Sequence, residues 1–498
     1  MKNNKSKQAR DVTALLNGAA ASYAQGRLED AADLYRQAAA ADPQDLRPIY
    51  SLALIDIRRG RLESARQQLR VVTAQDPNLY PAQQNLGAVC QNLNLWQEAA
   101  DAYRRALRLN PAAETHFSLA RALTVLGQVA ESSACYRALA ANPSVRLRAL
   151  TRLAVLDPAV IDEQDLTALQ SAADDPTTPA ATRIEAYFAL GFGLEERRAY
   201  KSAFAAFMAG NRLKQDALMA SPDLKARPDA LERAHELAAH FVIDRFDQEF
   251  LQRRLHGGST SAAPIFVIGM PRCGSSLIEQ ILSSHRDVQS MGENSTLSAV
   301  VDRGFTEPQG TSNWADLAEA YLSSMRQRGW NGAGRFVDKT LENHLRVGMI
   351  HLMFPKSVIL DSTRDPVDTC LSCYRQLFTE GNETLYDLGQ IGRAYVRYRR
   401  VMEHWDRVLP GRVIRVEHEK LVADTEGQVR RLVDACKLEW DPACLRFQET
   451  AGVVRTASAA QVRLPVFLTS IGRWTRFASE LEPLFHALGP YAPQQNGG

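Results

Sequence analysis

Two short stretches in the second half of the sequence combine arginine with hydroxyl side chains, which are groups that can bind anions, and the first of them also contains glycines. The first stretch is Gly269-Met270-Pro271-Arg272-Cys273-Gly274-Ser275-Ser276, and it follows the apolar run Pro264–Ile268. A loop of this kind, between a strand and a helix, points backbone N–H groups at an anion on the helix N-terminus. Ser275 stands where a nucleotide-hydrolysing P-loop carries lysine, so hydrolysis of ATP or GTP is not expected. A strand–helix turn without a ligand is the alternative interpretation.

The second stretch is Arg364-Asp365-Pro366, which follows the apolar run Ser357–Leu360. Ser372 lies eight residues after Arg364. If the residues that begin at Pro366 form a helix, Ser372 sits two turns into it. Arg364 and Ser372 can then face the same bound group.

These residues need a scaffold that alternates buried strands with helices. Short apolar runs predict strands at Pro264–Ile268, Arg335–Val337, Ser357–Leu360 and Val413–Val416. Helical segments are expected between and after them, at Ser275–Ser284, Glu342–Phe354, Pro366–Phe378 and Thr425–Cys436. This alternation favours a P-loop-like α/β domain with a parallel sheet covered on both faces.

The first half of the sequence repeats itself. Gly26-Arg27-Leu28-Glu29-Asp30-Ala31 returns 34 residues later as Gly60-Arg61-Leu62-Glu63-Ser64-Ala65, and related copies begin at Asn94 and Gly127. Each copy closes on a proline, at Pro43, Pro77, Pro111 and Pro143. Paired helices with small residues between them stack into a solenoid, because one pair cannot bury its apolar face alone. A further copy is expected at Ala186–Asn211.

These motifs resemble two known families. The 34-residue period resembles tetratricopeptide repeats. Pro271–Ser276 resembles the 5′-phosphosulfate loop of sulfotransferases, and Arg364 with Ser372 resembles the arginine and serine that hold the 3′-phosphate in that family. The second resemblance runs from Pro264 to about Gly489. It is closest to tyrosylprotein sulfotransferases and to bacterial proteins that join tetratricopeptide repeats to a sulfotransferase domain.

The resemblance implies further roles. Glu293, after Gly292, is similar to the family's catalytic base, and Lys339 is similar to the lysine that stabilises the transferring group. Ser458 and Arg473-Trp474 are similar to the family's serine and Lys-Trp pair. The catalytic residues implied are Glu293, Arg272 and Lys339, and the donor-binding residues are Arg272, Cys273, Gly274, Ser275, Ser276, Arg364, Ser372, Ser458 and Arg473.

The sequence departs from the family pattern after the base. Asn294 stands where the family has a second carboxylate, and Ser295-Thr296 replace its Thr-Arg. Since that arginine helps to hold an acidic peptide in the animal enzymes, the identity of the acceptor is left open. Glu293 could instead be a capping or surface carboxylate, with His285 as a rival base.

Other reactive residue types are interpreted as structural. No group of histidine, cysteine and carboxylate residues has the spacing of metal ligands, and no metal is expected. Cys370 and Cys373 have a spacing that fits one face of a helix. The histidines at 344, 351, 404 and 418 have no obvious partners in the sequence and are expected to be structural.

Composition limits the remaining possibilities. Hydrophobic residues make up 45% of the 498 residues and the formal net charge is +2, so a nucleic-acid partner is not expected. The sequence shows no signal peptide and no run of about 20 apolar residues that could span a bilayer. Seven scattered cysteines are typical of a reducing, cytoplasmic location.

The resulting expectation is an N-terminal all-α tetratricopeptide-repeat solenoid (residues 1–215), a helical connector and linker (216–262) and an α/β sulfotransferase domain (263–490). The donor is 3′-phosphoadenosine 5′-phosphosulfate, and the acceptor is tyrosine of a peptide or protein docked by the repeats. Arg58, Arg59, Arg104 and Arg105 are available for an acidic peptide. Alternatives are a small-molecule, glycan or lipid acceptor, a non-catalytic scaffold, and repeats that act as a spacer or as a homodimerisation element. Residues 1–215 are expected to fold alone, with the whole donor site beyond Pro264.

Overall fold

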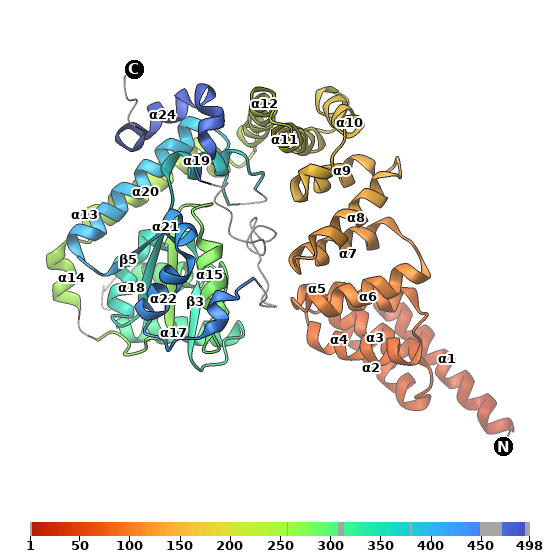
Figure 1. The fold of residues 1–498 in the computed structure, drawn as a ribbon. Coiled ribbons are helices and arrows are strands. Elements are labelled where there is room, and N and C mark those ends of the chain that lie inside the picture. The colour runs from red at the N-terminus through yellow and green to blue at the C-terminus, as the bar shows by residue number, and fades with distance from the viewer. Residues whose placement is uncertain (1, 256, 307–312, 379–380, 449–470, 494–498) are drawn as a thin grey trace. The chain divides into compact units, whose positions relative to one another are not determined.

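The computed structural model describes residues 2–255, 257–306, 313–378, 381–448 and 471–493 (Figure 1). The chain divides into two compact units, residues 1–149 and residues 150–498. The two units are described separately.

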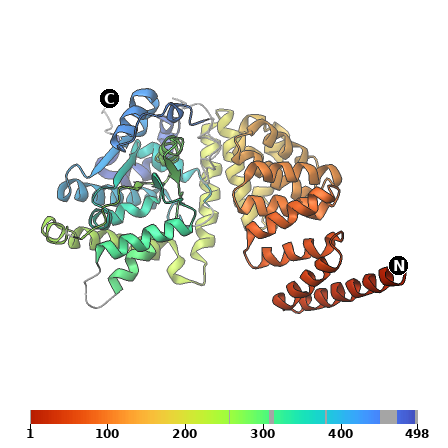
Figure 2. The ribbon, with the colours of Figure 1, turned by 90° about the horizontal axis from the view of Figure 1, so that it is seen from below.

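The first unit is built from antiparallel helical pairs that follow one another along the chain (Figures 1 and 2). Its helices are α1 (Lys2–Ala24), α2 (Leu28–Ala41), α3 (Leu46–Arg58), α4 (Leu62–Gln75), α5 (Tyr80–Asn92), α6 (Trp96–Leu109), α7 (Ala113–Val125) and α8 (Val129–Ala140). α9 (Arg146–Leu156) spans the division between the units.

The repeated sequence positions explain the pairs. The turn inside each pair has one residue with positive φ, at Gly26, Gly60, Asn94 and Gly127. Glycine and asparagine adopt this left-handed conformation at low cost, which is why these residue types recur there. Where a pair packs closest, a Cβ at Gly87 would lie 2.5 Å from the ring of Tyr103.

Two of the four arginines that the sequence suggested for binding an acidic peptide form ion pairs between successive repeats. Arg59 pairs with Glu29 at 2.9 Å, and Arg104 pairs with Glu131 at 2.8 Å. The charges of these two arginines are therefore compensated within the array.

The second unit holds a five-stranded parallel sheet with strand order β2-β3-β1-β4-β5. The strands are β1 (Pro264–Gly269), β2 (Val288–Ser290), β3 (Arg335–Asp338), β4 (Val358–Thr363) and β5 (Val413–Glu417). The expected α/β fold class with a parallel sheet is confirmed. β2 was not predicted, because Val288-Gln289-Ser290 has one apolar residue and no hydrophobic run.

The helices of the second unit precede the sheet in sequence, connect its strands and follow it. They are α10 (Glu163–Asp174), α11 (Ala180–Glu196), α12 (Tyr200–Met219), α13 (Pro228–Arg245), α14 (Gln248–Arg254), α15 (Ser275–Ser283), α16 (Thr296–Thr306), α17 (Trp314–Gln327), α18 (Val347–Met353), α19 (Pro366–Tyr374), α20 (Leu388–Val408), α21 (His418–Ala423), α22 (Thr425–Ala435) and α24 (Glu482–Leu488). A 3₁₀ segment, η6 (Arg473–Glu480), precedes α24. None of the described helices is long and apolar enough to cross a membrane.

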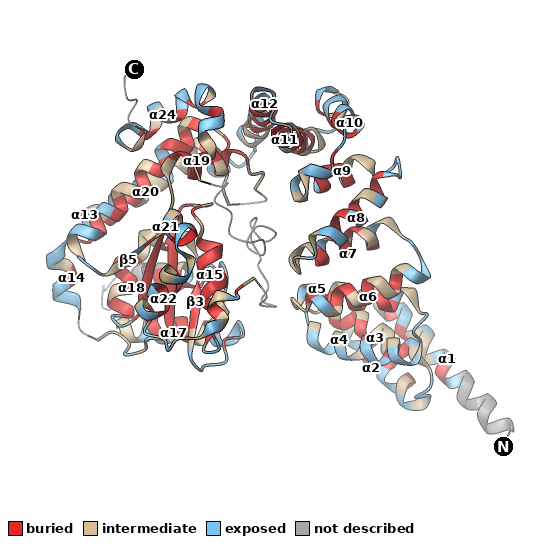
Figure 3. Ribbon diagram, in the orientation of Figure 1, coloured by how far each residue is buried: buried red, intermediate tan, exposed pale blue. Residues whose placement is uncertain are grey.

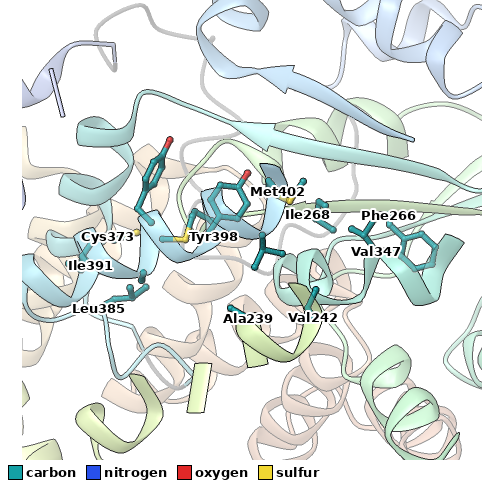
Figure 4. Close-up of a cluster of buried hydrophobic side chains, with 14 of the residues drawn as sticks. Ala239, Val242, Phe266, Ile268, Val347, Cys373, Leu385, Ile391, Tyr398 and Met402 are labelled. Carbon is teal, nitrogen blue, oxygen red and sulfur yellow. The ribbon is translucent and has the colours of Figure 1, made fainter. Parts of the chain in front are cut away.

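The central strands β1 and β4 are buried on both faces, as their red colour in Figure 3 shows, whereas the edge strand β5 is partly exposed. Alternate residues of β1 enter different cores: Phe266 and Ile268 join one cluster, and Ile265 and Val267 join the other. Ile268 shares the larger cluster with Cys373 of α19 and with Tyr398 and Met402 of α20 (Figure 4).

The C-x-x-C motif lies inside this core. Cys370 and Cys373 both belong to α19 and are fully buried as free thiols. Burial raises the pKa of the Cys373 thiol to about 12, which disfavours the reactive thiolate. The spacing therefore places two small hydrophobic side chains on the inner face of one helix.

The helical pair α11–α12 shares the core of the α/β fold. Phe188, Phe204 and Phe207 belong to the same buried cluster as Phe477, and Asn211 donates through Nδ2 to the carbonyl of Tyr374 at 2.8 Å. This pair therefore packs with the second unit, and independent folding of residues 1–215 stays a prediction. The helical periodicity predicts the pair but not its packing partner. The pair's outer apolar face still needs a partner to cover it. The extent of the repeat array to residue 215 stays a prediction.

Replacing Phe207 by alanine should destabilise the second unit. Phe207 is fully buried between α11 and the α/β core, and deletion of such a ring costs about 3–5 kcal/mol. Urea unfolding followed by tryptophan fluorescence measures the loss, since five of the six tryptophans lie beyond residue 150. Met208→Ala, at a half-exposed position of the same helix, is the control and should change stability by about 0.5 kcal/mol at most. Equal stability of the two variants would contradict the shared core.

Candidate active site

Every predicted catalytic or donor-binding group within the described residues lies just after the carboxyl end of a strand or on a segment packed against that edge. Glu293 follows β2, Lys339 follows β3, Arg272 follows β1 and Arg364 follows β4. β1 pairs with β3 on one side and with β4 on the other, so the strand order reverses at β1. Ligands of open α/β sheets bind at such a reversal, beyond the carboxyl ends of the strands.

The loop between β1 and α15 has the conformation of an anion-binding turn. Gly269, Arg272 and Gly274 have φ values of 147°, 68° and 102°. A Cβ at Gly269 would lie 2.7 Å from the carbonyl oxygen of Ser362, so glycine is required there. Gly274 precedes the first helical residue, Ser275, which leaves the first N–H groups of α15 at the loop.

The two predicted phosphate-binding stretches meet in space. Arg272 donates from Nε to Ser372 Oγ at 3.1 Å, across 100 residues of sequence. Arg364 donates from Nη1 to the carbonyl of Arg272 at 3.5 Å. The register explains the meeting, because Gly269 pairs with Ser362 in the sheet and both chains then leave the same edge.

Several guanidinium groups converge at this edge. Burial lowers the pKa of Arg272, and the charges of Arg364 and Arg473 act in the same direction. Burial likewise lowers the pKa of Arg375 to about 9, again with a contribution from Arg473 and Arg272. Mutual repulsion of buried cations is relieved by a bound anion. The residues present therefore fit a ligand with phosphate or sulfate groups.

The C-terminal segment is fixed to the same place by one carboxylate. Asp368 on α19 accepts from the backbone N–H of Gly472 at 2.6 Å and from that of Trp474 at 3.0 Å. Arg473, between them, begins η6 and donates from Nε to Glu195 at 2.7 Å. The predicted Ser458 lies outside the described residues.

The predicted base and the predicted lysine are partners. Lys339 donates from Nζ to a carboxylate oxygen of Glu293, and its backbone N–H bonds the carbonyl of Gly292 at 3.0 Å. Gly292 has a positive φ of 63°, which turns the chain between them. The lysine side chain is 1% exposed and the glutamate side chain 60% exposed. A buried cation thus holds a carboxylate that remains accessible from solvent.

A second carboxylate, missed by sequence reasoning, lies on the other side of this lysine. Glu279 of α15 is buried, its Oε2 lies 3.8 Å from Lys339 Nζ, and its Oε1 accepts from Ser290 Oγ at 2.6 Å. Burial raises the pKa of Glu279. The available signal was that Glu279 is the one charged residue of the helix Ser275–Ser283.

Asn294, which replaces the family's second carboxylate, has a structural position. Its Oδ1 accepts from the backbone N–H of Thr296 at 3.1 Å, at the start of α16. Its own backbone N–H bonds Thr340 Oγ1 at 3.1 Å. These bonds fix the strand-end turn that carries Glu293.

Several histidines form hydrogen bonds with the backbone inside the fold, and their structural role stays a prediction. His285, the rival base, is buried, with Nε2 at 2.8 Å from the carbonyl of Glu439 and Nδ1 accepting from the N–H of Asp287. His344 and His404 contact backbone carbonyls. Both ring nitrogens of His285 are engaged, so the ring is not placed to accept a substrate proton.

His418 differs from this interpretation. It follows β5, and its Nδ1 would lie 2.8 Å from a Cβ at Gly274, so the ring closes against the anion-binding loop. Within the described residues this buried nitrogen has no hydrogen-bond partner. Burial, with the charge of Arg364, lowers the pKa of His418 to about 4. Sequence spacing gave no indication that β5 ends beside β4 and the loop.

His418 should make the protein sensitive to acid. Because the folded-state pKa of about 4 lies below the ordinary value of 6.5, the unfolded chain takes up the proton first, and stability is lost as pH falls from 6.5 toward 4. Comparing urea unfolding at pH 7 and pH 5, His418→Asn should lose about 2 kcal/mol less than the wild type. His240→Asn, at an exposed site on α13, should lose as much as the wild type. The same loss in both variants would show that His418 is not the responsible group.

Comparisons with known proteins agree with this geometry. Residues 264–442 match the model of the sulfotransferase family, and residues 22–90 and 91–145 match tetratricopeptide-repeat models. The protein-tyrosine sulfotransferase A of Caenorhabditis elegans is 22% identical over 47% of this chain and 68% of its own. A putative protein-tyrosine sulfotransferase of Caenorhabditis briggsae is 23% identical over 43% of this chain and 82% of its own.

Longer and structural matches are also found. A protein of Aquifex aeolicus (strain VF5), named "Uncharacterized protein", is 29% identical over 88% of this chain, and the chain spans 58% of that protein. Among solved structures, the sulfotransferase domain from the curacin biosynthetic pathway is 16% identical with a TM-score of 0.31, covering 45% of this chain and 98% of that domain. The tetratricopeptide-repeat protein YrrB is 16% identical with a TM-score of 0.33, covering 41% of this chain and 98% of its own. Residues 264–442 are therefore a domain of the sulfotransferase family, and tetratricopeptide repeats precede it in the chain.

Proposed function

We propose that this protein transfers the sulfuryl group of 3′-phosphoadenosine 5′-phosphosulfate to an acceptor hydroxyl, most simply tyrosine of a peptide or protein. The observation that carries the proposal is the junction of the two phosphate-binding stretches, in which Arg272 bonds Ser372 and Arg364 bonds the backbone of Arg272. A donor with phosphate groups at both the 5′ and the 3′ position needs two neighbouring anion sites of this kind.

The residues of the site form two groups, one suited to the 5′-phosphosulfate of such a donor and one suited to its 3′-phosphate. The N–H groups at the start of α15 and the hydroxyls of Ser275 and Ser276 suit the 5′-phosphosulfate. Arg364, Ser372 and Arg473 suit the 3′-phosphate, with Ser458 as a further prediction. The donor itself supplies an activated sulfuryl group. Arg272 and Lys339 provide positive charge where a leaving phosphate oxygen would gain negative charge.

Glu293 is the group best placed to take the acceptor proton. A phenol with a pKa of about 10 is only ~0.1% ionised at pH 7, so a base within reach is useful. The Glu293 carboxylate is exposed to solvent on one side and bound to the buried Lys339 on the other. An acceptor that approaches from solvent therefore meets the carboxylate before it meets the lysine.

Ligand-induced thermal stabilisation tests the donor. Adenosine 3′,5′-bisphosphate should raise the melting temperature, because a ligand that binds only the folded state stabilises it. ATP with Mg²⁺ should have little effect, since Ser275 replaces the lysine of nucleotide-hydrolysing loops. Preferential stabilisation by ATP and Mg²⁺ would overturn the proposal and indicate a nucleotide hydrolase.

Arg364→Ala should weaken binding of adenosine 3′,5′-bisphosphate about ten- to hundredfold. The loss of one charge-assisted hydrogen bond to a phosphate costs about 1.5–3 kcal/mol. Isothermal titration calorimetry measures the affinity, and Arg328→Ala, at an exposed arginine of the same unit, is the control. Wild-type affinity in Arg364→Ala would remove this residue from the 3′-phosphate site.

The acceptor is the less constrained part of the proposal. Support for a peptide or protein acceptor comes from the tetratricopeptide repeats and from relatives named protein-tyrosine sulfotransferases. Compensation of Arg59 and Arg104 by carboxylates within the array removes part of the argument for an acidic peptide on that surface. A small molecule, glycan or lipid is the alternative acceptor. A cytoplasmic location and a homodimer stay predictions from the sequence.

A further inference from the structure

We propose that Glu195, on helix α11, is a positioning residue of the 3′-phosphate site that orients Arg473 toward the donor. The inference rests on the proposed function, because it assigns Arg473 to the 3′-phosphate. It extends the donor site to a helical pair that lies well before the α/β domain in the sequence and that sequence analysis assigned to the repeat array.

The contacts of Glu195 are specific. Its Oε1 accepts from Arg473 Nε at 2.7 Å, and its Oε2 accepts from Arg375 Nη2. The carboxylate is 3% exposed. Arg375 is the first residue after α19, the helix that carries Ser372. One carboxylate from α11 thus connects Arg473 with an arginine that directly follows the helix carrying Ser372.

The geometry of the Arg473 contact leaves donors available. A guanidinium has five N–H groups, and the contact with Glu195 uses the one on Nε. The Arg473 side chain is still 35% exposed, so its terminal amino groups can donate to a phosphate. Fixing Nε in advance reduces the conformational entropy that the long side chain would lose when the ligand binds.

Glu195 is held too firmly to be an anion that the phosphate displaces. The Arg375 guanidinium that binds it also packs over the rings of Phe192 and Phe207, at 5.3 and 5.5 Å from their centroids. α11 and α12 are themselves fixed to α19, where Asn211 bonds the carbonyl of Tyr374. The carboxylate therefore stays in place and holds Arg473 through its Nε.

The test measures how much the 3′-phosphate adds to affinity. Binding of adenosine 3′,5′-bisphosphate and of adenosine 5′-monophosphate is compared by calorimetry in the wild type, Glu195→Gln, Arg473→Ala and the double variant. The ratio of the two affinities should fall about tenfold in Glu195→Gln, because a charge-assisted contact loses its orientation. Glu195→Gln should add no further loss in the Arg473→Ala background, since Glu195 acts through that arginine. Glu196→Gln, the exposed neighbour on α11, is the matched control.

The outcomes separate the inference from the proposed function. If the wild type binds both nucleotides equally, the 3′-phosphate site itself is absent and the proposed function fails. If the wild type prefers the bisphosphate and Glu195→Gln keeps the full preference, Glu195 has a merely structural role and the inference fails. A stronger preference in Glu195→Gln would show that the carboxylate competes with phosphate, which also overturns it. Should Glu195→Gln not fold, Glu195→Asp, which keeps the charge but shortens the reach to Arg473, should lower the same ratio.

Discussion

Replacing Glu293 by glutamine is expected to lower the turnover of sulfuryl transfer about 10²–10⁴-fold, the usual cost of removing a general base. Glutamine keeps the size of the side chain and one oxygen for Lys339, so the strand-end turn at Gly292 should persist. Affinity for adenosine 3′,5′-bisphosphate should stay nearly constant. Steady-state kinetics with a tyrosine peptide and calorimetry of the bisphosphate measure the two quantities.

The matched control for this variant is Glu342→Gln, which removes an exposed carboxylate from the segment after β3. It should have wild-type turnover. Near-normal turnover in Glu293→Gln would transfer proton removal to solvent, because the imidazole of His285 is bonded at both nitrogens.

Lys339→Met is expected to reduce turnover about 10²–10³-fold, the range found when one donor to a developing negative charge is removed. Methionine retains much of the lysine volume in a position that is 1% exposed. The variant leaves Glu279 buried without its cation, and the raised pKa of Glu279 then favours its neutral form. The fall in turnover should therefore exceed any change in bisphosphate affinity. The exposed Lys356→Met is the control, and equal activity of the two variants would contradict the role of Lys339.

Acceptors of different acidity separate these two roles. Fluorinated tyrosine in the peptide lowers the pKa of the phenol, so less help is needed to remove the proton. The fluorinated peptide should partly restore the turnover of Glu293→Gln. It should not restore Lys339→Met, because that variant lacks charge at the leaving group and not at the acceptor. Restoration of both variants alike would mean that the two residues share a single role.

Local patterns made much of the fold predictable. The helical pairs could be identified from the 34-residue period and from the turn glycines Gly26, Gly60 and Gly127. Both signals lie within a single pair and do not depend on contacts with distant residues. The apolar run at Pro264–Ile268 and the glycines of the following loop likewise predict a strand, a turn and a helix in order. The short strand β2 could not be recognised, since two of its three residues are polar.

Long-range contacts explain what sequence reasoning missed in the site. Glu195 and Arg473 are 278 residues apart, and their pairing depends on how the pair α11–α12 packs against α19. His418 reaches the anion-binding loop because β5 pairs with β4. Glu279 was visible as the one charge in its helix, but its partner Lys339 comes from a neighbouring strand end. Spacing along the chain does not show which distant residues come into contact, because those contacts depend on the strand order and on helix packing.

The most direct test of the central claim is to follow the sulfuryl group itself. The purified protein is incubated with ³⁵S-labelled 3′-phosphoadenosine 5′-phosphosulfate and a cell lysate, and the label is separated into protein, glycan, lipid and small-molecule fractions. The account predicts protein-dependent labelling of a hydroxyl, recovered as sulfotyrosine after digestion, and little labelling with Lys339→Met or Glu293→Gln. Label in a non-protein fraction would still support sulfuryl transfer by this chain, but it would mean that the acceptor is not a protein. Labelling that is the same with the wild type, with Lys339→Met and with no added protein would contradict the claim that this chain transfers sulfuryl groups.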